Sequence, residues 1–570
     1  MAAHGALHAL AVWLLVHNWP ADQVWAMRFF AMVTFAVTSG VVVHMARCET
    51  GKARLILSST AIGLVFAALA WRIASLQPPE KALFEGDEIL ARSGFLVGIV
   101  VLYIVGPFIQ LYVATGTARF PYAGLHERAW SNFFIACLGG LYMVLFWVVL
   151  GLWAQLFTLV EIDLFRETFR NGWFAFPFTG AALGYGLAVA RESESIVVTL
   201  RTLSSRLLTT LLPLVAVVTV AFLATLVVVG VQHLLDTHST ASLVAAWCVV
   251  YFILLNGVYE DGSNPPPYGP AVCRVIEGAI LVMPVFVVLA GYALELRIAE
   301  YGLMPERVFA VAGIVLLGMY SVGYAIAALV RGKPWLPRIR TANIAMCPIV
   351  VAVGIALHLP VLDPVRLSVD DQLRRLKSGA VPIEKFDFGA LRFSLGRNGF
   401  EALADLERDG APGDVKLLHE RIARVRSAQN RRQLDKREWL ESGALVAADN
   451  SPPVPVDFLE DLKTSQPLWQ SLSCTAENPC RALLLDVDGD GTEELLVATT
   501  SATWFYEMPM FKRDQTGTWT TRGAFRVPPA ARDVPALADA FRRGDVHPTA
   551  PLIPDLLLGD QRLNWAEREP

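Results

Sequence analysis

The most specific chemical motif in the chain is an acidic loop, DVDGDGTEE, at residues 486–494. A hard cation such as Ca²⁺ takes about six to eight oxygen ligands from a tightly curved loop, and the glycines at 489 and 491 allow that curvature. Oxygen-bearing residues alternate along the loop, as a curved backbone requires if they are to face one centre. The spacing predicts a Ca²⁺ site built from Asp486, Asp488, Asp490, Thr492 through its carbonyl, and Glu494.

The acidic loop does not follow the pattern of a helix-flanked calcium site. Its twelfth position is Val497, which stands in an apolar run instead of supplying a carboxylate. The loop is closer to the strand–loop–strand calcium loops of FG-GAP repeats, although the chain holds one copy and a repeat protein would hold several. The alternative is an Asp-Gly hairpin turn without metal, because turns favour the same residues. Both interpretations stay open at this stage.

The cysteines fall into two groups. Cys474 and Cys480 lie six residues apart in SLSCTAENPC, within a polar part of the chain. Their spacing predicts a disulfide, which would require an oxidising compartment, and the alternative is two free thiols. The other five cysteines are scattered in or beside apolar runs with no metal-ligand spacing, which is typical of small apolar side chains; they are Cys48, Cys137, Cys248, Cys273 and Cys347.

Composition shows what must position these groups. The chain is 54% hydrophobic and 18% charged, with a mean hydropathy of +0.46, whereas soluble domains carry about 25% charged residues. Charged residues make up about 11% of residues 1–361 and about 29% of residues 362–570. We therefore expect the first part in lipid and the second in water. The two parts have formal charges of +2 and −6, and neither indicates a nucleic-acid partner.

Eleven apolar runs are candidates for crossing a ~30 Å hydrocarbon layer, which takes roughly 20 residues of helix. The first is the weakest, because it is short and ends near Pro20. The runs lie near 3–18, 24–45, 54–75, 94–116, 131–157, 172–190, 207–232, 239–257, 274–296, 307–331 and 341–361. The predicted fold is therefore mainly α, a polytopic transmembrane helical bundle followed by a soluble α+β domain.

Basic residues in the short connections predict the orientation. The loops after the second, fourth, sixth, eighth and tenth runs carry 13 Lys and Arg, and the opposite loops carry 6. Cytoplasmic loops retain positive charge during insertion. We therefore expect the 13-charge loops in the cytoplasm and residues 362–570 on the extracytoplasmic side.

The polar part divides into two further segments. Residues 362–430 show helical periodicity, with Ser368 as an expected helix cap and Gly379 as a stop. Residues 431–570 contain short β-favouring runs near 481–485, 494–500, 503–508 and 518–527, separated by the acidic loop and by a turn at KRDQTG. A helix at DVPALADAFRRG and a closing hairpin at DLLLGDQRLNW complete an expected α+β domain.

Several sequence blocks resemble a bacterial multi-pass membrane family called domain of unknown function 4153. The blocks are NGVYEDGSNPPPYGP, RIAEYGLMPER at 297–307, DPVRLS at 363–368, KSG, and FDFGALRF. The resemblance covers most of the chain and implies an integral protein of the bacterial envelope, with no activity, substrate or catalytic residue attached. At residues 258–261, VYED, the sequence differs from the residues usual in the family.

Three functions fit these observations. The first is a non-enzymatic inner-membrane protein whose bundle anchors an extracytoplasmic domain that binds an envelope partner or senses conditions. The second is a transporter or channel, disfavoured because ionisable residues in the spans lie near their ends. The third is a membrane enzyme acting on envelope lipid or glycan, for which Glu260, Asp261 and the acidic residues at 80–88 are the candidates. The expected partner in each case is the lipid bilayer, and Ca²⁺ is the one expected cofactor.

Overall fold

The computed structural model describes residues 1–570 except 18–22, 47–50, 77–88, 233–239, 331–334, 429, 432, 436–438, 440–442, 444, 466–467, 469–471, 473–478, 500–506, 515, 527–533, 549–555, 559–560 and 564–570. The chain forms two compact units, Met1–Ile422 and Ala423–Pro570. The helices that follow residue 361 belong to the first unit as far as residue 422.

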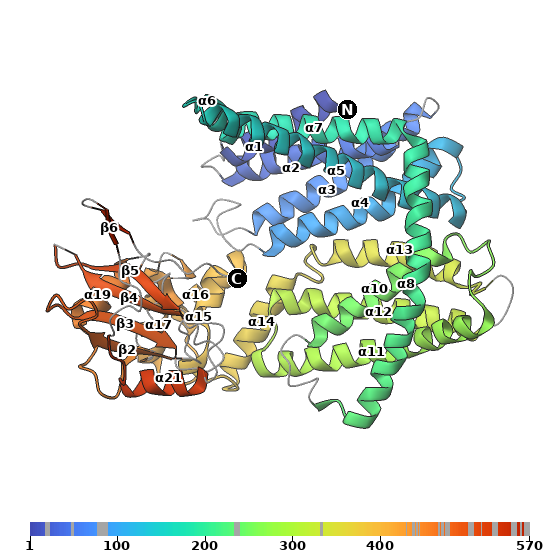
Figure 1. Ribbon diagram of the computed structural model, residues 1–570. Helices are drawn as coiled ribbons and strands as arrows, with labels where there is room; N and C mark the ends of the chain where they lie inside the picture. Colours follow the sequence, from blue (N-terminus) through green and yellow to red (C-terminus); the bar gives the residue numbers. More distant parts are fainter. Residues whose placement is uncertain are drawn as a thin grey trace. The chain divides into compact units, whose positions relative to one another are not determined.

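The first unit is helical throughout its described length (Figure 1). Its elements in chain order are α1 (Ala2–His17), α2 (Gln23–Met45), α3 (Lys52–Ser75), α4 (Ile89–Thr115), α5 (Tyr122–Thr158), α6 (Leu164–Arg170), α7 (Gly172–Glu192), α8 (Glu194–Val229), α10 (Thr240–Tyr259), α11 (Pro270–Tyr301), α12 (Pro305–Leu329), α13 (Ile339–Ala356), α14 (Pro364–Lys377), η1 (Ile383–Lys385), α15 (Phe388–Phe393) and α16 (Gly396–Asp409), with α17 (Val415–Ser427) continuing into the second unit. Helix α8 runs across the others and packs against both α5 and α7 on one side and α10 and α11 on the other.

Ten of the helices in the described part of the chain are long and apolar enough to cross a membrane. They coincide with ten of the eleven expected runs, so the predicted bundle is confirmed. The exception is the first run, where α1 holds a shorter apolar stretch, Gly5–Leu14. The protein is an integral multi-pass membrane protein.

Glycines bring α1 and α7 into close contact. A Cβ added at Gly5 would lie 2.0 Å from the carbonyl oxygen of Gly180, and one added at Gly184 would lie 2.7 Å from that of Met1. Such approaches exclude any side chain, because a methyl group needs well over 3 Å. The GAALGYG stretch of α7 therefore serves packing.

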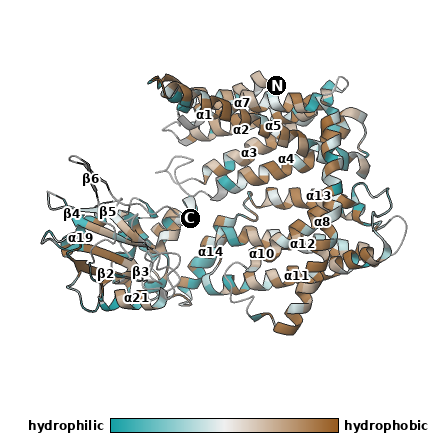
Figure 2. Ribbon diagram, viewed as in Figure 1, coloured by the Kyte–Doolittle hydropathy of each residue, from teal (hydrophilic) through white to brown (hydrophobic). Residues whose placement is uncertain are grey.

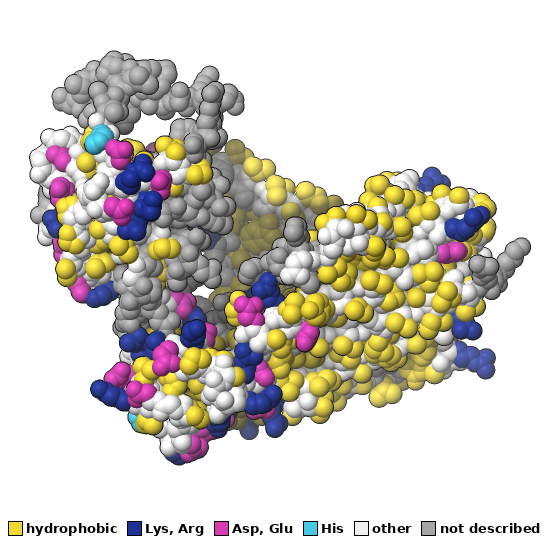
Figure 3. Space-filling view, turned by 90° about the horizontal axis from the view of Figure 1, so that it is seen from below, with side chains coloured by type: hydrophobic (Ala, Val, Ile, Leu, Met, Phe, Trp, Pro, Cys, Tyr) yellow, Lys and Arg dark blue, Asp and Glu magenta, His cyan; other side chains and the backbone are white. Residues whose placement is uncertain are grey.

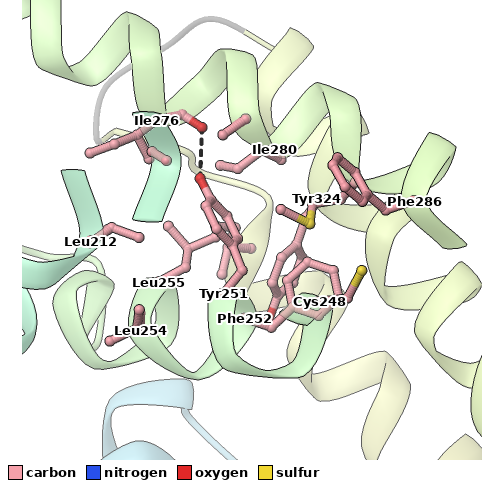
Figure 4. Packing of buried hydrophobic residues seen from close by; sticks show 14 of the residues in the cluster. Leu212, Cys248, Tyr251, Phe252, Leu254, Leu255, Ile276, Ile280, Phe286 and Tyr324 are labelled. Atoms are coloured by element: carbon pink, nitrogen blue, oxygen red, sulfur yellow. Dashed lines mark hydrogen bonds between the residues drawn. The ribbon is translucent and has the colours of Figure 1, made fainter. Parts of the chain in front are cut away.

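The largest buried cluster joins α8, α10, α11 and α12 (Figure 4). Tyr251 and Tyr324 are fully buried within it. The Tyr251 hydroxyl donates to the carbonyl oxygen of Ile276 over 2.9 Å, so its polar atom is satisfied inside an apolar core.

Around this core the outer faces of the helices are apolar. Figure 2 shows the long helices of the first unit predominantly hydrophobic, and Figure 3 shows a broad apolar surface on the same unit. Many large apolar side chains of these helices are exposed, such as Val148 and Leu152 of α5 and Leu214 of α8. Exposed apolar surface on this scale indicates lipid contact.

Helix α14 begins at a different cap from the one expected. Asp363 accepts hydrogen bonds from the backbone N–H groups of Val365 and Arg366, and Pro364 holds the first helical position. The predicted cap, Ser368, lies inside the helix, where its hydroxyl donates to the carbonyl oxygen of Pro364. The prediction was wrong because Asp followed by Pro is the stronger start signal.

The second unit is built around a five-stranded sheet. Its strands are β1 (Leu445–Ala447), β2 (Cys480–Leu485), β3 (Glu494–Thr499), β4 (Glu507–Arg513) and β5 (Trp519–Arg526), in that spatial order. β1 is parallel to β2, and the other neighbours are antiparallel. The expected turn at KRDQTG joins β4 to β5, and the expected closing hairpin is β6 (Leu556–Leu558) with β7 (Gln561–Leu563).

Each face of this sheet carries a helix. Phe458 of α19 (Val456–Thr464) packs on one face with Phe511 and Trp519. Phe541 of α21 (Val534–Arg543) packs on the other face with Leu483 and Leu496. The alternation of side chains along β2 and β3 produces these two cores. The α+β domain expected from the sequence is confirmed.

Candidate functional site

A polar cavity of about 470 Å³ opens at one end of the first unit. Three elements line it: the first three turns of α5, the N-terminal half of α8, and the turn that ends α10. The lining residues are Ala123, His126, Glu127, Trp130, Arg201, Thr202, Ser205, Gly257, Glu260, Asp261, Ser263 and Asn264. The volume suits a small polar molecule, since ligand sites typically measure about 300–1,000 Å³.

Glu260 has an unusual backbone at the end of α10. Its φ is +51°, in the left-handed region where glycine or asparagine normally ends a helix. Its N–H still donates to the carbonyl oxygen of Asn256 over 3.0 Å, and its carboxylate accepts a hydrogen bond of 2.7 Å from the Ser205 hydroxyl. A non-glycine residue in this conformation costs about 1 kcal/mol or more, and such residues gather at functional sites.

Asp261 is held in its ionised form. The backbone N–H of Ser263 donates to its Oδ1 over 2.9 Å, and the Ser263 hydroxyl donates to the same oxygen. These two hydrogen bonds hold the pKa of Asp261 below its ordinary value. The carboxylates of Glu260 and Asp261 are therefore both held in place in one turn. The cavity is also lined by Arg201, which lies 3.6 Å from Glu127.

A row of four aromatic side chains lies along one face of α5, and two of them line the cavity. Tyr122, His126, Trp130 and Phe134 recur every fourth residue, with ring centroids 5.9, 6.1 and 5.8 Å apart in turn. This spacing places them on one face of the helix. His126 and Trp130 line the cavity, with their ring planes inclined at 49° to each other.

A hydrogen-bonded network adjoins the cavity and ties four helices together. The Asn256 amide donates to the Tyr324 hydroxyl over 2.7 Å, and that hydroxyl donates to Asn343. The Asn343 amide donates to Asn256 over 2.6 Å and to the Tyr122 hydroxyl over 2.7 Å. The network fixes the ends of α5, α10, α12 and α13 relative to one another, which makes the cavity a rigid one.

Within the described part of the chain, the helix ends next to the basic connections lie together at this end of the unit. Arg54 donates to the carbonyl oxygen of Tyr112 at the end of α4, and Arg191 donates to the carbonyl oxygen of Met45 over 2.7 Å. Arg201 of α8 faces Glu127 of α5, and the Asn343 to Tyr122 bond joins the beginning of α13 to that of α5. Figure 3 shows Lys and Arg side chains at the right-hand end of the apolar surface.

The opposite end of the unit holds α14 in place. Arg72 of α3 forms an ion pair of 2.9 Å with Asp363. Arg375 donates to the carbonyl oxygens of Ala299 and Glu300 at the end of α11, and Asp371 accepts from the N–H of Leu303 over 2.8 Å. The RIAEYGLMPER block is thus bound by the helix of the DPVRLS block, which gives these two sequence blocks a structural role.

The acidic loop joins β2 to β3, as expected. Asp486 accepts from the backbone N–H groups of Gly489 over 2.8 Å and Gly491 over 3.0 Å, and both glycines have a positive φ. One ligand oxygen from each of Asp486, Asp488 and Glu494 lies within 4.8 Å of the other two. The structure therefore brings together three of the five predicted ligands.

At the acidic loop, sequence reasoning missed Lys512. Its ammonium lies 2.7 Å from Asp488, 2.6 Å from Asp490 and 2.8 Å from the buried Glu494. The three carboxylates raise the pKa of Lys512 well above its ordinary value. Asp490 thus faces the lysine, and the backbone N–H of Thr492 donates to Asp490. The β3–β4 register, which pairs Leu495 with Phe511, places position 512 opposite position 494.

Of the two cysteines in the predicted disulfide, the structure describes only Cys480. Cys480 is the first residue of β2, is buried, and is disulfide-bonded. Cys474 lies outside the described residues, so its pairing with Cys480 stays a prediction. Cys137, Cys248, Cys273 and Cys347 are free thiols, of which Cys248 and Cys273 are buried and Cys137 is exposed. Cys48 lies outside the described residues.

Sequence reasoning named Glu260 and Asp261 but missed the rest of the cavity. The available signal was the four-residue repeat of rings on α5, which a search for catalytic motifs does not detect. The acidic residues 80–88, the other suggested chemical feature, lie outside the described residues.

Comparisons with known proteins agree with the sequence resemblance. A family model described as "Domain of unknown function (DUF4153)" matches residues 6–406. No curated protein and no solved structure matches the chain.

Proposed function

Because the chain belongs to the family of domain of unknown function 4153, whose description gives no activity, we propose a function from the geometry. The protein is a bacterial inner-membrane anchor that holds residues 423–570 on the extracytoplasmic side, where this domain binds an envelope partner or senses conditions. One observation carries the proposal: the basic connections share one end of the helical unit, and α14 is bound at the other end.

The positive-inside rule assigns the basic end to the cytoplasm. The chain leaves α13 at the opposite end, beside Arg72 and the end of α11. It then continues into the second unit without another candidate span among the described residues. An oxidising compartment outside the cytoplasm is also consistent with a disulfide at Cys480.

Labelling of introduced cysteines tests the orientation in intact cells, in a chain whose cysteines outside the predicted disulfide are replaced by serine. Lys416→Cys replaces a side chain on α17 that is 87% exposed, and Glu194→Cys replaces an exposed one at the basic end. We expect a membrane-impermeant maleimide to label position 416 in intact cells and position 194 only after lysis. The reverse pattern would overturn the orientation and the proposed anchor role together.

The two rival functions receive less support. A transporter needs polar groups that converge near the middle of the membrane, whereas the cavity is at one end. Its lining includes neither Arg28 nor Glu277, two ionisable residues within the apolar helices α2 and α11. Glu277 accepts a hydrogen bond from Trp335. An enzyme acting on the outer side of the envelope would need Glu260 and Asp261 there, but both share the end with the basic connections.

We also propose that the acidic loop binds Ca²⁺, with Lys512 as its competitor. The close approach of Asp486, Asp488 and Glu494 supports a cation at this point, and Lys512 supplies a built-in one. Replacing Lys512 with Met removes the competing charge, so Ca²⁺ should then bind more tightly. Calorimetry on the full chain compares the Ca²⁺ affinity of the parent, of Lys512→Met and of Asp488→Asn. Equal affinity in all three would overturn the proposal and show that the loop is an acidic turn neutralised by Lys512.

A further inference from the structure

The turn that ends α10 presents two carboxylates to the cavity with unused acceptor capacity. Glu260 receives one hydrogen bond, from Ser205, and Asp261 receives both of its hydrogen bonds on Oδ1. Among the described residues no hydrogen bond reaches the second oxygen of either group. A carboxylate oxygen accepts up to two hydrogen bonds, so a donor entering the cavity finds two acceptors side by side.

The cationic side chains near the cavity compensate carboxylates other than Glu260. Arg201 lies beside Glu127, and Arg340 attracts Asp261 electrostatically. No Lys or Arg of the described chain lies within ion-pair distance of Glu260. Two adjacent like charges repel each other unless a cation compensates them. The cavity therefore has a place for one positive charge next to Glu260.

The geometry favours an organic cation over a metal ion. Among the described residues the one convergent group of three metal-ligating side chains is in the acidic loop, not in this cavity. A volume of about 470 Å³ also far exceeds that of an ion. The indole of Trp130 lines the cavity, and its face attracts a cation and the methylene groups next to it.

Gly257 allows the helices around Trp130 to pack closely. A Cβ at Gly257 of α10 would lie 2.2 Å from Leu208 and 3.4 Å from the Trp130 ring. Glycine at this position lets α8 and the indole approach α10 closely. Beneath the turn, the ring of buried Tyr259 lies against Gly262.

We propose that this cavity binds a small organic molecule through a primary ammonium group. The ammonium donates to Glu260 and Asp261, and its carbon chain lies against Trp130. The same chemistry is found in soluble amines and in amine-bearing lipid headgroups, and the end of a membrane bundle is accessible to both. This inference is independent of the orientation and of Ca²⁺ binding.

Binding is measured on the purified full chain by calorimetry and by the shift in melting temperature. The probes are ethanolamine and glycerophosphoethanolamine, and the controls are ethylene glycol and glycerophosphate, which lack the ammonium group. We expect the two amines to bind and the controls to fail. A lipid arm compares nanodiscs of phosphatidylglycerol with and without phosphatidylethanolamine: stabilisation by the amine lipid identifies a headgroup as the source, and a response to soluble ethanolamine alone identifies a free amine.

Variants decide whether the cavity is responsible. Glu260→Gln and Asp261→Asn should each weaken amine binding about tenfold or more, because each removes a charge-assisted hydrogen bond. Glu194→Gln makes the same charge change at the same end, outside the cavity lining, and should bind normally. Trp130→Leu keeps both carboxylates and should weaken binding less, so one informative variant remains if Glu260→Gln does not fold. Equal binding by the parent and by folded Glu260→Gln and Asp261→Asn, or equal binding of ethylene glycol, would overturn the proposal.

Discussion

The ion pair between Arg72 and Asp363 should control how firmly α14 is attached to the membrane helices. The two groups are 291 positions apart, their charged atoms are 2.9 Å apart, and their side chains are 29% and 3% exposed. At an effective dielectric constant of about 20 the attraction is about 6 kcal/mol. Desolvation cancels much of it, and partial exposure of Arg72 screens the rest. We therefore expect a coupling free energy of about 2 kcal/mol.

Substitutions at Asp363 separate its two roles. Asp363→Asn removes the charge and keeps a side-chain oxygen that can cap α14, whereas Asp363→Ala removes both. The cap bonds to Val365 and Arg366 should make Asp363→Ala worse by about 1 kcal/mol. Arg72→Gln, alone and combined with Asp363→Asn, completes a double-mutant cycle for the ion pair.

Hydrogen exchange of the α14 amides reports local detachment without requiring the whole chain to unfold in one step. A loss of about 2 kcal/mol corresponds to about 30-fold faster exchange. The control is a second pair on the same helix, Arg366 and Asp370, which are 3.8 Å apart and 64% and 59% exposed; its coupling should stay below about 0.5 kcal/mol. Equal coupling in the two cycles would refute the reasoning.

Three further outcomes are expected. Arg375→Met should lower the free energy of unfolding, measured by denaturant titration, by about 1–2 kcal/mol, and Arg375→Lys by less, because Arg375 caps the carbonyl end of α11. Burial lowers the pKa of His358, which faces Ser93 and Asp363, so the unfolded chain binds the proton first; thermal stability should fall as pH drops below about 6.5, and His358→Gln should flatten that fall. Gly180→Ala should destabilise the α1–α7 contact, whereas Gly140→Ala, which has open space around it, should not; equal melting temperatures would contradict the close packing.

The membrane helices could be predicted from sequence because the bilayer requires long apolar runs whatever their neighbours are. The ends of those helices were less predictable. Helices α5 and α8 extend well before the apolar runs expected at 131 and 207, and the additional turns carry His126, Trp130 and Arg201. An estimate from apolar composition makes these helices too short, because aromatic and basic residues are typical both of a helix at the membrane surface and of a loop.

Contacts between distant residues explain what the sequence could not reveal. The acidic loop was evident from its own spacing, but Lys512 enters it through the β3–β4 register. Arg72 stood near a span end, where extension of its side chain toward water was a sufficient explanation; its partner Asp363 is on another element. Local patterns predict which residue types are present, whereas long-range pairing decides which charges remain available to a ligand.

The extent of the family match separates the two proposed binding sites. The match covers residues 6–406 and so includes α5, α8 and α10, which form the cavity, and the blocks that bind α14 to α11. The acidic loop, at 486–494, lies beyond the match. A property of the family as a whole must therefore come from the helical unit, and among its described residues the cavity at the basic end offers polar groups that could bind a ligand. Ca²⁺ binding, if measured, would characterise the domain that this chain carries on that unit. The amine titration and the Ca²⁺ titration accordingly test different levels of the protein's function, and either can succeed without the other.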